Sequence, residues 1–102
     1  MLVVIEIDAS QEGVTMVITG EVDLTTRSAL AEQLSAVLRT GPRQLILDLA
    51  GATFMDCGSA RLIVGAGRFL PEGGRLIIRS PSRAVRRVLE LTRLDAELEI
   101  EG

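Results

Sequence analysis

The sequence predicts one α/β domain, with helices packed on a central, mixed but mostly parallel sheet of about five strands. Apolar runs of strand length alternate with segments of helical periodicity, in the order β-β-α-β-α-β-α-β. Strands that alternate with helices imply parallel pairing and right-handed crossovers. The chain has 102 residues, of which 47% are hydrophobic, enough for one core but not for two domains. We therefore assign residues 1–102 to a single domain.

The first two strands are expected to form a hairpin. Residues 2–7 and 14–19 are rich in β-branched side chains, which favour extended structure. Gly13 lies between them, where a tight turn needs a residue with a permissive backbone. With only two phenylalanines in the chain, the core beneath these strands must be aliphatic.

A helix is expected over residues 26–39, followed by a buried strand over residues 44–49. Thr25 or Thr26 is expected to cap the helix, and Gly41-Pro42 to end it. Four apolar side chains recur on one face of the predicted helix: Leu30, Leu34, Val37 and Leu38. The strand is apolar nearly throughout, which is typical of burial on both faces of a parallel sheet.

The C-terminal half predicts two more helices and two more strands. A second helix is expected over residues 60–70, where Gly65-Ala66-Gly67 predicts tight packing on one side. A strand follows over residues 75–79, and Ser80-Pro81 is expected to start the third helix. Residues 96–100 alternate polar and apolar, which predicts a half-exposed edge strand.

Charged residues concentrate near the C-terminus. Four arginines lie on the fourth predicted strand and the third helix: Arg79, Arg83, Arg86 and Arg87. We expect them to form a solvated surface or to pair with the acidic strand that carries Glu97, Glu99 and Glu101. Charges on an edge strand also discourage pairing between sheets.

The missing residue types exclude most catalytic chemistry. All eleven basic residues are arginine, so the chain has neither histidine nor lysine. Without histidine no Ser-His or Cys-His pair exists, and without lysine no Schiff base or Walker-type phosphate loop exists. One cysteine and carboxylates make a poor zinc ligand set. We expect a protein that is not an enzyme, with no cofactor and no metal.

Charge and cysteine content indicate the partner class and the compartment. The net charge of −3 disfavours duplex nucleic acid, and two aromatic residues are too few for a stacking platform. The single cysteine, Cys57, excludes an internal disulfide and indicates a reducing compartment. Residues 1–5 lack the basic leader of a signal peptide, and no apolar run approaches the roughly 20 residues of a membrane span. We expect a cytoplasmic protein without membrane insertion.

The candidate functional site is the turn Met55-Asp56-Cys57-Gly58-Ser59, which follows the third predicted strand and opens the second helix. Strand ends of this kind carry ligand and partner sites in open α/β sheets. Asp56 suits the N-cap, where it serves the helix, a partner or both. Cys57 falls in the first helical turn, where a thiol is either inert or activated by the positive end of the helix dipole.

Three segments resemble STAS domains, specifically the bacterial anti-sigma factor antagonists. FMDCGSARLIVG resembles the turn that opens the family's second helix, in which Asp is followed by Ser, Ser or Thr, and Gly. TGEVDLTTRSAL, within residues 18–30, resembles the family's Gly-Glu-x-Asp element and supplies Asp23. SPSRAVRRVLELTRLD, residues 80–95, resembles its third helix. The similarity covers essentially the whole chain in the same order.

The resemblance implies a binding protein that acts by partner switching. Such antagonists bind an anti-sigma factor that is also a serine kinase of the GHKL type, and so release a sigma factor for transcription. The kinase inactivates them by phosphorylating the serine after the Asp of the turn. A homodimer of this chain is a further possible assembly. Carried over to this chain, the resemblance implies partner-binding roles for Asp23, Asp56, Cys57, Gly58 and Ser59.

The chain departs from the family at the phosphoacceptor. Cys57 stands where the family has serine, and Ser59 stands where it usually has glycine. Three interpretations follow, in order of preference: an antagonist that escapes phosphorylation, control by oxidation of Cys57, and a displaced phosphosite at Ser59. An alternative function is a STAS-type accessory subunit of a membrane lipid-transport (ABC) system. That role needs no phosphorylation and so also suits the missing serine.

Overall fold

The computed structural model describes residues 3–102, so the first residue of the predicted opening strand lies outside it. β1 (Val3–Ala9) and β2 (Val14–Val22) form the expected antiparallel hairpin. The backbones of Ser10 and Gly13 close its turn by reciprocal hydrogen bonds of 2.8 and 3.3 Å. Gly13 has a φ of +156°, and a Cβ there would lie 2.3 Å from the carbonyl oxygen of Gln44. The turn therefore requires glycine, because any side chain would collide with β3.

The sheet is mixed, as expected, and its strands lie in the order β1-β2-β3-β5-β6. β3 (Gln44–Asp48), β5 (Arg75–Arg79) and β6 (Glu99–Glu101) pair in parallel with their neighbours, and β3 also pairs in parallel with β2. A further strand, β4 (Ala52–Met55), was not predicted; it pairs in parallel with the last residues of β2. Its four residues do not alternate between polar and apolar, so the usual signal of a strand is missing.

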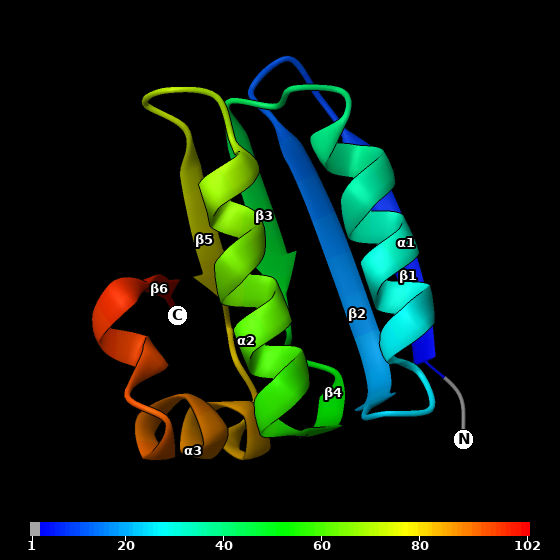
Figure 1. The fold of residues 1–102 in the computed structure, drawn as a ribbon, viewed down its shortest axis with the longest axis vertical. Coiled ribbons are helices and arrows are strands. Elements are labelled where there is room, and N and C mark those ends of the chain that lie inside the picture. The colour runs from blue at the N-terminus through cyan, green and yellow to red at the C-terminus, as the bar shows by residue number, and fades with distance from the viewer. Residues whose placement is uncertain (1–2) are drawn as a thin grey trace.

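The helices cover the sheet from one side (Figure 1). α1 (Arg27–Leu38) and α2 (Cys57–Ala66) lie side by side across it, and α3 (Arg83–Leu91) lies at its end, against β4. The core between these layers is aliphatic, as predicted. Its fully buried side chains include Met16, Ile18, Leu30, Leu45, Leu47, Ile63, Ile78 and Val85.

α2 begins at Cys57, directly after the predicted Asp56 cap, although the periodic helical segment was expected only from residue 60. The predicted start of the third helix is wrong. The third helix is not capped by Ser80, which has a left-handed φ of +50° and donates its amide to the Glu101 carbonyl (2.6 Å). The cap is Ser82, whose Oγ accepts from the amide of Val85 (3.2 Å). Ser80 is tied to β6, so the helix can begin only after Pro81.

The C-terminal strand starts later than predicted. The short 3-10 helix η2 (Leu94–Glu97) occupies the first residues of the expected strand 96–100. The acidic strand does pair with arginines, but these are on β5 and not on α3. Arg79 Nε lies 3.0 Å from a carboxylate oxygen of Glu101, and Arg75 pairs with Glu99. Parallel pairing with β5 places these side chains on one face.

Candidate functional site

The turn that opens α2 lies where β2 and β4 end together. The amide of Asp56 donates to the carbonyl of Val22 (3.0 Å), which ties the ends of the two parallel strands. Oδ1 of Asp56 accepts from the amide of Ser59 (2.8 Å), so Asp56 is the N-cap, as predicted. Asp23 follows Val22 in the chain. The structure therefore brings Asp23 and Asp56 to the same edge, although 33 positions separate them in the sequence.

An arginine from the start of α1 covers this turn. Nη2 of Arg27 lies 2.8 Å from Oδ2 of Asp56, and Nε of Arg27 donates to Oγ of Ser59 (3.2 Å). The ion pair is partly exposed, with 34% of the Arg27 side chain and 27% of the Asp56 side chain accessible. A Cβ on Gly58 would lie 2.5 Å from Nη2 of Arg27. Gly58 thus makes the space in which the guanidinium lies.

Arg27 was missed by the sequence analysis. It lies in the TGEVDLTTRSAL segment, whose pattern does not indicate which residue reaches α2. A signal for it did exist, because glycine in the first turn of a helix marks a close approach by another group. Only the packing of α1 beside α2 identifies that group as Arg27.

Asp23 organises the loop between β2 and α1. Its Oδ1 accepts from the amide of Thr25 (2.9 Å), the hydroxyl of Thr25 (2.6 Å) and the amide of Thr26 (3.2 Å). The expected threonine cap is wrong. Thr26 occupies the N-cap position, but its hydroxyl donates to the carbonyl of Glu21 (2.7 Å) and makes no capping bond. Asp23 satisfies the amides of Thr25 and Thr26, which precede the helix, so the first turn of α1 has no side-chain cap.

Both carboxylates of the site favour the ionised form. Hydrogen bonding from the Thr25 hydroxyl, aided by the amides of Thr25 and Thr26, lowers the pKa of Asp23. Burial opposes ionisation of Asp56, but hydrogen bonds from Ser59 and Arg27 and the charge of Arg27 outweigh it, so its pKa is lowered too. The edge therefore carries two negative charges at neutral pH, one of them screened by Arg27.

Cys57 and Ser59 have opposite environments. Cys57 is exposed at the first position of α2, with a free thiol. Ser59 is completely buried, and its Oγ accepts from Arg27. A kinase needs access to the hydroxyl that it phosphorylates, so this burial argues against Ser59 as a displaced phosphosite.

Apolar side chains are exposed beside the charged residues. Leu24, next to Asp23, is 74% exposed, and Phe54, two residues before Asp56, is 47% exposed. Both lie at the edge where β2 and β4 end, since Val22 pairs with Met55 there. Exposed apolar groups with charges around them are typical of protein–protein contact surfaces.

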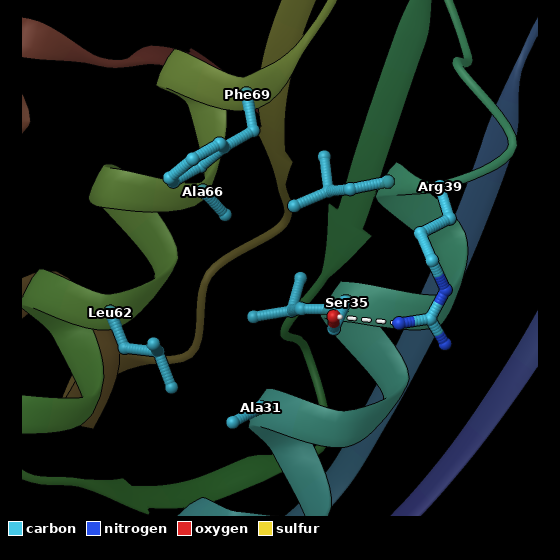
Figure 2. A pocket seen from close by; sticks show the side chains of 8 residues that line it. Ala31, Ser35, Arg39, Leu62, Ala66 and Phe69 are labelled. Atoms are coloured by element: carbon cyan, nitrogen blue, oxygen red, sulfur yellow. Dashed lines mark hydrogen bonds between the residues drawn. The ribbon is translucent and has the colours of Figure 1, made fainter.

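A groove between α1 and α2 begins one helical turn beyond the Arg27–Asp56 pair. Its volume is about 390 Å³, and six of the eight residues that line it are apolar: Ala31, Leu34, Leu38, Leu62, Ala66 and Phe69. Figure 2 shows Leu62 and Ala66 directed toward the side chains of α1 across this space, with Phe69 next to Ala66. Arg39 lies at its rim, where it donates to Oγ of Ser35 (3.2 Å).

Two other kinds of site are absent from residues 3–102. In this part of the chain no group of three or more His, Cys, Asp or Glu side chains is placed to hold a metal ion. None of the helices formed by the same residues has the length and apolarity to cross a membrane.

The element order, the mixed sheet and the capped turn at the start of α2 define an α/β domain of the STAS type. A family model described as "Mlab, STAS domain" matches residues 5–100, which is nearly the whole chain. The chain belongs to the STAS domain family, as the resemblance of its three segments predicted.

Solved structures with this fold extend the comparison. An anti-sigma factor antagonist from Mycobacterium paratuberculosis superposes with a TM-score of 0.92 at 21% identity, over 99% of this chain and 86% of that one. An antagonist from Thermotoga maritima, described as putative, superposes with a TM-score of 0.86 at 23% identity, over 96% of this chain and 86% of that one. The phosphorylated form of the Bacillus cell fate determinant SpoIIAA superposes with a TM-score of 0.72 at 22% identity, over 97% of this chain and 92% of that one. At these identities the likeness establishes the fold.

Proposed function

We propose that this chain is an anti-sigma factor antagonist, a cytoplasmic binding protein without catalytic activity. It binds an anti-sigma factor, itself a serine kinase of the GHKL type, and so releases a sigma factor for transcription. The observation that carries the proposal is the edge formed by Asp23, Asp56 and the exposed Cys57. The three similar structures support it, since two are named as anti-sigma factor antagonists and the third is SpoIIAA in a phosphorylated form.

The geometry of this edge suits recognition of a partner with basic groups. Asp23 carries a negative charge that no ion pair within residues 3–102 neutralises, and Asp56 one that is paired with Arg27. Both carboxylates are held by hydrogen bonds, so little side-chain entropy is lost when they bind. Leu24 and Phe54 add exposed apolar surface next to them. In such an interface the apolar surface contributes affinity, and the fixed charges determine the orientation of the partner.

Cys57 occupies the position of the phosphoacceptor and has no hydroxyl. A serine there would be exposed to a kinase, as the thiol is. A phosphate would add a charge of about −1.5 to −2 next to two carboxylates and repel any partner that an acidic group faces. With cysteine this switch is absent, and the domain stays competent to bind.

Oxidation of the exposed Cys57 is the second mode of control that we consider. A sulfenate or mixed disulfide would then occupy the place of the phosphate. Under this mode peroxide lowers partner binding in the native protein and leaves a Cys57→Ser variant unaffected. If binding by the native protein does not respond to peroxide, the oxidation mode is excluded and unswitched binding remains.

The proposal is tested by affinity purification of the tagged chain from extracts of its own cells. We expect an anti-sigma factor to co-purify with the native chain and much less of it with Asp23→Asn. Asparagine keeps the Oδ1 acceptor that organises the loop and removes only the charge. Asp8→Asn is the matched control, because Asp8 is exposed on β1 at the sheet edge away from the turn. Equal recovery with both variants would contradict the assignment of the site.

A second candidate function is an accessory subunit of a membrane lipid-transport (ABC) system. The absence of a phosphoacceptor at position 57 favours it, because such a subunit needs no kinase switch. The same purification separates the two functions. Recovery of transporter ATPase subunits without an anti-sigma factor would replace the first proposal by the second.

A further inference from the structure

The outer side of α2 carries two adjoining hollows, on the flank away from α1. One, of about 250 Å³, is lined by residues of α2, of the 3-10 helix η1 (Gly67–Phe69) that continues it, and of η2: Arg61, Val64, Gly65, Arg68, Leu94 and Glu97. The other, of about 360 Å³, shares Val64, Arg68 and Glu97 with it and reaches the start of β5. Together they form a trough between α2 and the C-terminal segment, which lie next to each other in Figure 1.

Gly65 opens this trough. A Cβ at Gly65 would meet no described atom within 4 Å, so the tight packing expected of this glycine is wrong. Gly67 does pack closely, since a Cβ there would lie 3.2 Å from Cδ2 of Leu76. Gly65 lies in the last turn of α2, and glycine in a helix costs up to about 1 kcal/mol relative to alanine. Here that cost is not offset by any packing within the domain.

The trough has an excess of positive charge. Of its arginines, Arg75 is neutralised by Glu99, with which it forms an ion pair. Arg61 and Arg68 form no ion pair and no side-chain hydrogen bond with any residue from 3 to 102, and neither does Glu97. Two guanidinium groups therefore face a single carboxylate, in a chain whose net charge is −3.

The trough is continuous with the edge proposed to bind the partner. Cys57, Arg61, Gly65 and Arg68 recur at the spacing of one helix face, and all four are at least partly exposed. The Cys57 turn and the trough are thus two ends of one accessible stripe along α2 and η1. A partner that covers the turn and lies along α2 reaches the trough without crossing buried surface.

We propose that the trough receives an acidic segment of the protein partner, with carboxylates between Arg61 and Arg68 and an apolar side chain over Gly65 and Val64. The identity of that partner as the anti-sigma factor rests on the proposed function. The preference for an acidic segment is independent of the proposed function, because it follows from the charges of the trough. Arginine holds a carboxylate through two parallel N–H donors, which suits recognition of such a segment.

The experiment is an NMR titration of the ¹⁵N-labelled full chain with a capped peptide of leucine and glutamate at helical spacing. We expect saturable shifts of the Gly65 amide and of the Nε–H signals of Arg61 and Arg68. The same peptide with glutamine in place of glutamate should not produce them. Shifts confined to other surfaces, or none, would overturn the proposal.

Three variants sharpen the result. Arg61→Glu with Arg68→Glu should abolish the Gly65 amide shift. Gly65→Leu fills the hollow while leaving both charges in place, and it should abolish the shifts of the Arg61 and Arg68 Nε–H signals. Arg39→Glu, the same charge change on α1, should keep all three shifts. Retention of these shifts in either of the first two variants would also overturn the proposal. Because the titration needs no anti-sigma factor, its outcome is independent of the co-purification that tests the proposed function.

Discussion

Because Arg27 lies against Gly58, we expect the substitution Gly58→Ser to destabilise the native chain but to stabilise a variant that lacks the Arg27 side chain. In Gly58→Ser the new Cβ would lie 2.5 Å from Nη2 and 2.8 Å from Cζ of Arg27. The flexible guanidinium must therefore move away. It then loses its 2.8 Å contact with Asp56 and its 3.2 Å hydrogen bond to Ser59.

The expected cost is small and can be estimated from its parts. The Arg27–Asp56 pair is partly exposed, so losing it costs about 0.5 kcal/mol. Loss of the hydrogen bond to the buried hydroxyl of Ser59 costs about 1 kcal/mol. Replacing glycine by serine within a helix returns about 0.5 kcal/mol. Gly58→Ser should therefore destabilise the native chain by about 1 kcal/mol.

In an Arg27→Ala background the collision is absent, so the same serine should stabilise the chain by about 0.5 kcal/mol. Urea unfolding of the four proteins of this double-mutant cycle measures the difference, provided that the m value stays constant. Gly65→Ser is the control, since its site is open, and it should stabilise both backgrounds equally. If Gly58→Ser destabilises both backgrounds equally, the inferred role of Gly58 is refuted.

Three further predictions concern acid stability, phosphorylation and the hairpin. The lowered pKa values of Asp23 and Asp56 stabilise the fold above about pH 4, the unfolded value, and this contribution is lost as the pH falls through the lower folded values. Asp56→Asn should accordingly lose less stability between pH 7 and pH 3 in urea titrations, and an unchanged loss would contradict the pKa argument. Mass spectrometry after incubation with the cognate kinase and ATP should show no added phosphate on the native chain and one on Cys57→Ser; a phosphate on native Ser59 would exclude escape from phosphorylation. Gly13→Ala should cost more than about 1 kcal/mol in urea unfolding, because of its positive φ and the Gln44 carbonyl, and a smaller loss would show that the turn adapts.

Local patterns were enough for the elements with strong periodicity. The hairpin, α1 and the strands β3 and β5 lie close to where the sequence placed them, because each has a regular spacing of apolar side chains or a clear turn residue. β4 was missed because a strand of four residues without alternation has no such pattern. The cap of α3 was misplaced because Ser80 and Ser82 look alike in sequence. Only the bond from Ser80 to Glu101 distinguishes them.

The candidate site divides in the same way. The sequence by itself determined the acidic turn, the cap role of Asp56, the departure at Cys57 and the family, since these depend on residue types at short spacing. Tertiary structure alone decided that Arg27 lies over Gly58, and that Ser59 is buried while Cys57 is exposed. The Arg27–Gly58 contact joins residues that are distant in the chain. The burial of Ser59 follows from contacts of the same kind. Packing of helices on a sheet decides such contacts, and no local pattern encodes them.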